Sequence, residues 1–154
     1  MTMTRVLVLL GSRSDEQAMH GCTEYLKKFG ISSDLVVSSA HRQPDETAAI
    51  VRSAEQNGYT LVIAAAGMAA HLPGFAASLT TLPVIGVPLE GSALNGVDAL
   101  YSIVQMPSGI PVATVAIGPA GAKNAAVLAA EIIALQERPV KEKLIEFRKN
   151  GSKF

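Results

Sequence analysis

The stretch RVLVLLGS at 5–12 decides the fold class of this chain. Residues 5–10 form a nearly unbroken apolar run, and the glycine and serine that follow are typical of a turn. An apolar run without polar alternation predicts a strand buried on both faces, as the strands of a parallel sheet are. Beyond the turn, Ser14 or Asp15 is placed to cap a helix that runs to about Phe29.

The same strand-turn-helix unit recurs along the chain. Strands that alternate with helices at this spacing predict right-handed crossovers and one parallel sheet. Five strands favour a flavodoxin-like order, 2-1-3-4-5, in a three-layer α/β sandwich over the larger six-stranded arrangement. The predicted strands are 5–10, 34–38, 60–65, 82–87 and 112–117, and the helices between them are 15–29, 44–58, a short one after 74, 96–105 and 122–136.

The length and the C-terminal pattern predict one catalytic domain over residues 1–154. A chain of 154 residues fits a single domain. Pro139 is expected to break the last long helix, and a charged amphipathic helical tail follows from about that residue. Cys22, the single cysteine, permits no internal disulfide and no thiol metal cluster, and its place in a helix favours a small buried residue.

The charge composition excludes several kinds of partner. Lys and Arg number 13, as do Asp and Glu, so neither nucleic acid nor a membrane surface is an expected partner. Charged residues make up 17%, below the roughly 25% usual for a globular domain, which favours burial of some surface in a homo-oligomer. With no signal-peptide pattern and no apolar run of roughly 18 residues, the expected location is the cytoplasm.

In sheets of this kind, ligands bind beyond the carboxyl ends of the strands. The first such turn is Gly11 to Asp15. Gly11 lets a ligand approach the backbone, Ser12 and Ser14 offer hydroxyl groups, and the following helix N-terminus favours an anion. Asp15 either caps the helix or accepts hydrogen bonds from ribose hydroxyls, and the sequence leaves both interpretations open.

The second turn, Ser39-Ala40-His41-Arg42, carries a stronger signal. Arg42 has the donor geometry to bind phosphate, and His41 can carry a proton near neutral pH. The alternative is structural: His41 would bond a carbonyl, and Arg42 would pair with a surface carboxylate. Position at a strand end favours the functional interpretation.

The third turn, 66–74, places His71 among small residues. A lone histidine in such a segment is more often hydrogen-bonded in a structural role. The small residues at 64–70 could instead leave an apolar cavity for a small neutral molecule. His20 lies mid-helix and is expected at the surface. The three histidines lack metal-ligand spacing, so no metal site is expected.

The three turns taken together resemble the family of N5-carboxyaminoimidazole ribonucleotide mutases of bacterial purine synthesis. The resemblance covers roughly residues 5–136, and no single motif would carry it. The matching motifs are GSRSD at 11–15, SAHR at 39–42, AAHLPG at 69–74, PVIGVP at 83–88, GVD at 96–98, SIVQMP at 102–107, GIPV at 109–112 and AKNA at 122–125.

The resemblance implies a flavodoxin-like homo-octamer with no metal and no organic cofactor. It implies an isomerase that moves the carboxylate of the substrate from its exocyclic nitrogen to C4 of the imidazole ring. His41 matches the general acid–base residue, and the other matching positions bind substrate or line the pocket. Those positions are Gly11, Ser12, Ser14, Asp15, Ser39, Ala40, Arg42, Gly67, Ala69, His71 and Leu72.

A second branch of the family carboxylates aminoimidazole ribonucleotide directly with CO2. Arg42 after His41, and His71-Leu72-Pro73, resemble the mutase branch. Met68 and Ala65 stand where the mutase pattern usually has glycine, so Met68 either points away from the pocket or narrows it. The loop 106–111 is placed to complete the pocket of a neighbouring subunit.

Two rival functions come from other classes of protein. A non-catalytic nucleotide-binding module would use the same phosphate-binding turns without turnover. A flavodoxin-like electron carrier is disfavoured because the chain has no Trp and few aromatic residues to sandwich a flavin.

For the mutase we expect His41 to protonate the exocyclic nitrogen of the substrate. The released CO2 is then held in a pocket that excludes water, where C4 of the ring attacks it.

Overall fold

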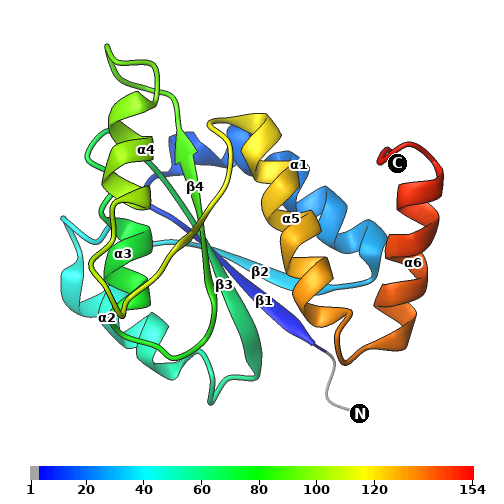
Figure 1. Ribbon diagram of the computed structural model, residues 1–154. Coiled ribbons are helices and arrows are strands. Elements are labelled where there is room, and N and C mark those ends of the chain that lie inside the picture. The colour runs from blue at the N-terminus through cyan, green and yellow to red at the C-terminus, as the bar shows by residue number, and fades with distance from the viewer. Residues whose placement is uncertain (1–3) are drawn as a thin grey trace.

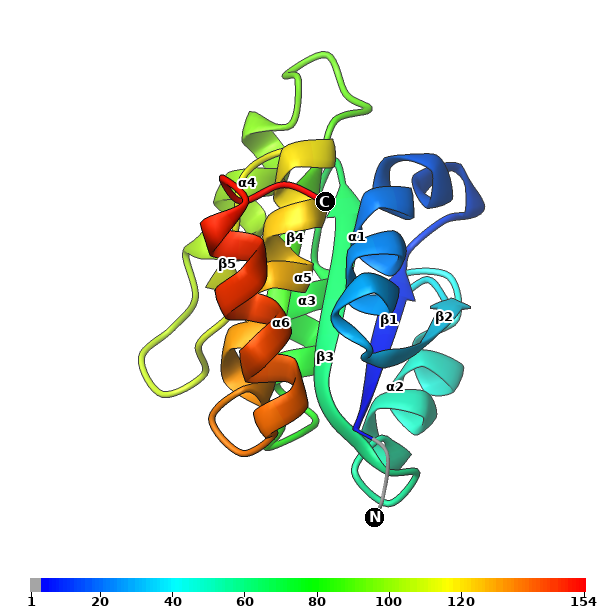
Figure 2. The ribbon, with the colours of Figure 1, turned by 90° about the vertical axis from the view of Figure 1, so that its right-hand side faces the viewer.

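A computed structural model describes residues 4–154. It contains one parallel sheet of five strands in the order β2-β1-β3-β4-β5, which confirms the predicted topology (Figures 1 and 2). The strands are β1 (Arg5–Leu10), β2 (Ser32–Val37), β3 (Tyr59–Gly67), β4 (Val84–Leu89) and β5 (Ala113–Thr114). The helices are the short 3-10 turn η1 (Arg13–Asp15), α1 (Glu16–Phe29), α2 (Pro44–Ser53), α3 (Leu72–Ala77), α4 (Val97–Val104), α5 (Pro119–Ile133) and α6 (Arg138–Lys149).

Helices cover both faces of the sheet, as Figure 1 shows. Alternate residues of β1 point to opposite faces, so Val6 and Val8 join one buried cluster while Leu7 and Leu9 join the other. The first cluster packs under α1, α5 and α6, and the second packs under α2, α3 and α4. Burial on both faces explains the continuous apolar runs of β1, β3 and β4, whereas the edge strand β2 is only partly buried and includes Asp34.

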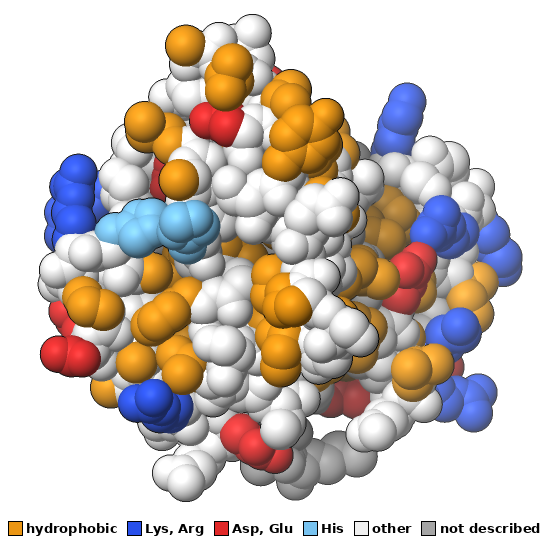
Figure 3. All heavy atoms as spheres, turned by 60° about the vertical axis from the view of Figure 1, so that its left-hand side comes forward, with side chains coloured by type: hydrophobic (Ala, Val, Ile, Leu, Met, Phe, Trp, Pro, Cys, Tyr) orange, Lys and Arg blue, Asp and Glu red, His pale blue; other side chains and the backbone are white. Residues whose placement is uncertain are grey.

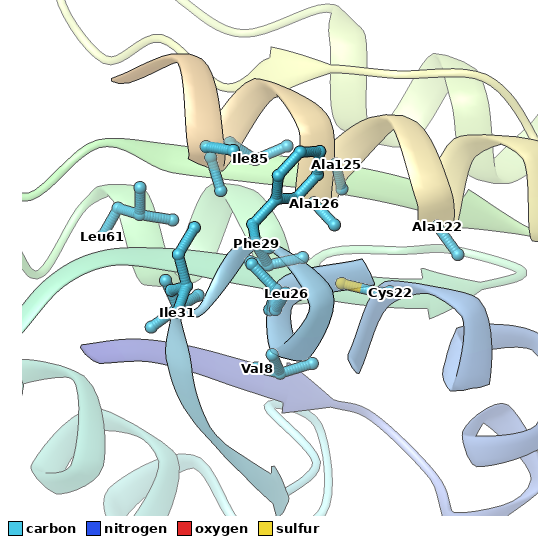
Figure 4. Close-up of a cluster of buried hydrophobic side chains, with 14 of the residues drawn as sticks. Val8, Cys22, Leu26, Phe29, Ile31, Leu61, Ile85, Ala122, Ala125 and Ala126 are labelled. Carbon is cyan, nitrogen blue, oxygen red and sulfur yellow. The ribbon is translucent and has the colours of Figure 1, made fainter. Parts of the chain in front are cut away.

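The alanine-rich α5 allows close packing against α1. Phe29 is fully buried and lies near Ala125 and Ala126 in the cluster of Figure 4. Cys22 is buried in the same cluster, as expected, and burial raises the pKa of its thiol to about 12. The thiol is therefore protonated and unreactive at neutral pH.

Several predicted boundaries were wrong, and the shifts matter for the site. The helix after Pro44 ends at Ser53, not at Gly58. β3 continues to Gly67, and β4 spans 84–89 instead of 82–87. Each of these two strands therefore ends two residues later than predicted, so residues 66–67 and 88–89 belong to the carboxyl ends of the sheet.

The fifth strand is much shorter than the predicted 112–117 because its neighbour contains Pro88. The carbonyl groups of Gly86 and Pro88 still accept hydrogen bonds from Val115 (3.1 Å) and Gly118 (2.8 Å). Pro88 has no N–H group to donate in return, so the ladder loses its regularity there.

The C-terminal segment forms a helix slightly earlier than predicted. α5 ends at Ile133, before Pro139, and α6 begins at Arg138 with Pro139 in its first turn, where proline needs no hydrogen-bond partner. α6 returns to the core through Phe147, whose ring lies 5.2 Å from that of Phe29. Within residues 4–154, no helix has both the length and the apolar character needed to cross a membrane.

Candidate active site

A pocket of about 450 Å³ lies at the carboxyl ends of the first four strands. Every substrate-binding or catalytic residue predicted from the sequence lines it, although the three turns are far apart in the chain. The lining consists of Gly11, Ser12, Ser14, Asp15, Ser39, Ala40, His41, Arg42, Ala66, Gly67, Met68, Ala69, His71, Leu72, Glu90 and Gly91.

Ser12 organises the first turn. Its hydroxyl oxygen accepts hydrogen bonds from the backbone N–H of Ser14 (3.3 Å) and from the Ser14 hydroxyl (2.9 Å). Ser12 therefore caps η1, and Asp15, one of the two predicted caps of the following helix, stands at the N-cap position of α1. Asp15 makes no side-chain capping bond, so its carboxylate is available for another partner.

Asp15 is held in a half-buried position at the pocket. Burial raises the pKa of its carboxyl group, and a backbone hydrogen bond from Ser12 acts in the opposite direction. A partly desolvated carboxylate accepts hydrogen bonds strongly, since fewer water molecules compete for it. This environment suits an acceptor for ligand hydroxyl groups.

The second turn is anchored by a buried hydrogen-bonded pair that the sequence analysis missed. Thr47 donates its hydroxyl to the Gln43 carbonyl (2.9 Å), so Ser38 is the donor in the 2.6 Å contact between the two hydroxyls. Both side chains are fully buried. The Ser38 N–H also donates to the Leu10 carbonyl (2.9 Å), which ties the start of the turn to the end of β1.

His41 and His71 meet across two turns. The Nε2 atom of His41 lies 2.6 Å from the Nδ1 atom of His71, and the rings are edge to face with centroids 4.7 Å apart. One of these nitrogens donates and the other accepts. His71 is therefore hydrogen-bonded, as the structural interpretation required, but to the candidate proton carrier. Figure 3 shows histidine side chains together in one pale-blue area of the surface.

Arg42 is exposed beside His41 and forms no salt bridge within residues 4–154. The predicted alternative, a pair with a surface carboxylate, is absent from that part of the chain. The backbone N–H of Arg42 donates to the Ser39 hydroxyl (3.3 Å), which fixes the turn while leaving the guanidinium group free. An unpaired guanidinium group at a pocket is suited to bind an anion.

The third turn supplies small and apolar surface. Leu72 is buried at the start of α3, and Ala66 is buried at the end of β3. Between them, Met68 has a positive φ of 55° and a side chain that is 61% exposed. Met68 thus lines the pocket and does not turn away into the core.

Glu90 and Gly91 line the pocket outside the three predicted turns. They follow β4 directly, and the same rule of strand carboxyl ends would have found them had the strand been extended to Leu89. The described residues hold no cluster of three or more side chains suited to a metal ion. His20 is exposed on α1 and is not part of the pocket.

A parallel α/β sheet whose carboxyl edge carries a pocket lined by two histidines and by Arg42, which has no salt bridge among the described residues, is suited to an enzyme that acts on a small molecule. The profile of the AIR carboxylase family matches residues 5–153, and this chain belongs to that family.

Curated relatives refine the placement within the family. The chain is 51% identical to N5-carboxyaminoimidazole ribonucleotide mutase from Brucella melitensis biotype 1, over 94% of this chain and 89% of the relative. It is 50% identical to the protein of that name from Escherichia coli strain K12, over 94% and 86%. The crystal structure of Treponema denticola PurE superposes with a TM-score of 0.87 at 29% identity, covering 97% of this chain and 92% of that one.

Proposed function

We propose that this chain is an N5-carboxyaminoimidazole ribonucleotide mutase. It moves the carboxylate from the exocyclic nitrogen to C4 of the imidazole ring and gives 4-carboxy-5-aminoimidazole ribonucleotide in purine (IMP) biosynthesis. The observation that carries the proposal is the meeting of the linked pair His41–His71 with the unpaired Arg42 in one pocket. Relatives that share about half of the sequence have this name.

Different residues of the pocket bind different parts of the substrate. Arg42 and the Ser12 hydroxyl hold the phosphate, because a guanidinium group and a hydroxyl donate to phosphate oxygens. The N-terminus of the first helical segment adds favourable partial charge on the same side. Asp15 accepts hydrogen bonds from the ribose hydroxyls, for which its half-buried carboxylate is suited.

His41 carries the proton in both halves of the reaction. In its protonated form it gives the proton to the exocyclic nitrogen as the N–C bond breaks, and the electrons of that bond stay on nitrogen. CO2 is released beside the aminoimidazole ring, whose nucleophilic C4 then attacks it. His41 removes the C4 proton and returns to its starting state, so no net proton is consumed.

His71 positions the His41 ring. The Nε2 atom of His41 makes the 2.6 Å contact with His71, so the Nδ1 atom of His41 is the ring nitrogen that His71 does not engage. A partner at one ring nitrogen selects the tautomer and orientation of a histidine. His71 therefore prepares His41 for transfer at a defined atom, and it is a positioning residue in this mechanism.

The other predicted properties belong to the same proposal. Residues 1–154 act as one catalytic domain that needs neither metal nor organic cofactor. A homo-octamer is supported by exposed apolar side chains along α4, namely Val97, Tyr101 and Val104, together with the low charged fraction. The loop 106–111 would reach a neighbouring pocket in that assembly. A phosphorylated substrate that cannot cross a bilayer unaided fits a cytoplasmic enzyme.

Two parallel assays test the proposal. Purified protein is given either N5-carboxyaminoimidazole ribonucleotide or aminoimidazole ribonucleotide with bicarbonate, and formation of the C4-carboxylated product is followed in each. We expect rapid conversion of the first substrate and little of the second at moderate bicarbonate. Faster product formation from the second pair would instead identify the direct carboxylase, and binding without turnover would identify a non-catalytic module.

A further inference from the structure

Met68 occupies an unusual backbone position in the pocket. Its φ of 55° lies in the left-handed region, which is unfavourable for residues other than glycine. Within residues 4–154, Asn95 and Ser152 are the other non-glycine residues with positive φ, and neither lines the pocket. Backbone strain of this kind persists where the surrounding structure holds it in place, and it concentrates at functional sites.

The sharp turn between β3 and α3 sets this conformation. A side chain at Gly67 would place Cβ 3.3 Å from the carbonyl oxygen of Leu89, so the end of β3 lies tight against β4. The carbonyl of Met68 then accepts a hydrogen bond from the N–H of Ala70 (2.9 Å). Glycine at position 68 would make the same turn with less strain, so the turn does not require the methionine side chain.

The side chain adds one property that the pocket otherwise lacks. The other long lining side chains are polar or charged, apart from the buried Leu72. Met68 is 61% exposed, and its unbranched thioether can change rotamer to fit a flat ring. A sulfur atom also contacts aromatic rings favourably. Met68 is therefore the exposed, flexible apolar side chain among the residues that line the pocket.

We propose that Met68 folds over the imidazole ring of the bound nucleotide and keeps CO2 in the pocket until C4 attacks it. This inference rests on the proposed mutase function. If CO2 escapes, the substrate and one proton from His41 give aminoimidazole ribonucleotide and CO2, and His41 must regain a proton from water. If CO2 is retained, C4 captures it and the proton returns to His41. The Met68 side chain therefore favours capture of CO2 by C4 over its escape.

Isotope retention measures this selection. Substrate labelled with 13C in its transferable carboxylate is converted in a single turnover in unlabelled bicarbonate, and the label in the C4-carboxylated product is measured by mass spectrometry. We expect near-complete retention in the wild type and a loss of at least about half in Met68→Gly. Met68→Gln, of equal length but polar, is expected to lose label too, whereas Met68→Leu retains most of it.

Asn95→Gly is the matched control, because it removes a left-handed non-glycine residue outside the pocket lining. Met68→Gly is expected to raise Tm and Asn95→Gly to change it little, because asparagine tolerates the left-handed region, and only Met68→Gly lowers retention. If the wild type forms the C4-carboxylated product and Met68→Gly retains as much label as it does, the role of Met68 is overturned while the proposed function stands. A wild type that forms no C4-carboxylated product would overturn the proposed function, and this inference with it.

Discussion

At the amino ends of β1, β2 and β3, the charged side chains pair with one another, whereas the charged side chains at the carboxyl ends form no salt bridge among the described residues. Asp34 accepts hydrogen bonds from Arg5 and from the Tyr59 hydroxyl (2.9 Å), and Arg5 also donates to the Asn57 carbonyl (2.9 Å). Arg42 at the opposite edge has no ion pair within residues 4–154. Satisfied groups stabilise the fold, and unsatisfied ones are left for a ligand.

Two aspartates show the same difference in their pKa values. The hydrogen bond from Tyr59, with a further one from Arg5, lowers the pKa of Asp34. Burial raises the pKa of Asp15. Ionisation of Asp34 therefore favours folding, and ionisation of Asp15 opposes it. The ionised carboxylate of Asp15 therefore costs stability at the pocket edge, and a ligand that binds this carboxylate would offset the cost.

The largest expected effect is at the binding edge. His41→Asn is expected to lower kcat for the carboxylate transfer by roughly 10²–10⁴-fold, the usual contribution of a general acid–base group. Steady-state kinetics measure it, with Tm as a check on folding. His20→Asn, on an exposed histidine outside the pocket, serves as control and leaves kcat unchanged. Wild-type turnover in His41→Asn contradicts the mechanism.

Arg42→Met is expected to raise KM by about 10–100-fold with a smaller change in kcat, because a hydrogen bond to a charged group contributes about 1.5–3 kcal/mol. The substitution keeps the length and removes the charge. Arg52→Met is the control. Arg52 lies on α2 and, like Arg42, is exposed and has no ion pair in the described residues. An unchanged KM for Arg42→Met would exclude Arg42 as the phosphate ligand.

At the amino edge, Asp34→Asn is expected to lower the free energy of unfolding at pH 7 by about 1 kcal/mol, since the Arg5–Asp34 pair is partly exposed. The pKa of Asp34 is lower in the folded state than in the unfolded one. Its stabilisation is complete above the unfolded pKa and disappears as the pH falls through the folded pKa.

Urea unfolding at pH 7 and in acid measures this difference. The stability of Asp34→Asn and wild type should converge in acid, while kcat and KM stay unchanged. Glu55→Gln, on an exposed residue without a salt bridge among residues 4–154, is the control. A stability gap that persists in acid would show that the charge of Asp34 is not its source.

The smallest expected effect has the opposite sign. Asp15→Asn is expected to raise the free energy of unfolding at pH 7 by roughly 0.5 kcal/mol or less, because the side chain is only half-buried. The pKa of Asp15 is raised by folding, so the cost of its ionisation is absent below the unfolded pKa and complete above the folded pKa. The gain should therefore vanish in acid.

Substrate affinity should fall in the same variant, as expected of a ribose ligand. Titration calorimetry and urea unfolding on one preparation measure both quantities. A variant that loses stability at pH 7 would place Asp15 with Asp34 among the residues that stabilise the fold, and it would remove the contrast between the two edges.

Local pattern in the sequence was enough to predict the sheet and the three turns that line most of the pocket. Apolar runs predicted five parallel strands in the observed order, since strands buried on both faces need no polar alternation. The rule that ligands bind at strand carboxyl ends led to three turns, and the pocket includes every residue selected from them. Both inferences depend on neighbours in sequence or on fixed topology.

Tertiary structure alone decided how these residues meet. The 2.6 Å contact of His41 with His71 joins residues 30 positions apart, and the Ser38–Thr47 pair joins the residue after β2 to α2. Glu90 lines the pocket because β4 stays paired with β3 as far as Leu89, opposite Gly67. Periodicity determines which face a residue occupies, whereas packing between distant segments determines its partner and its exposure to water.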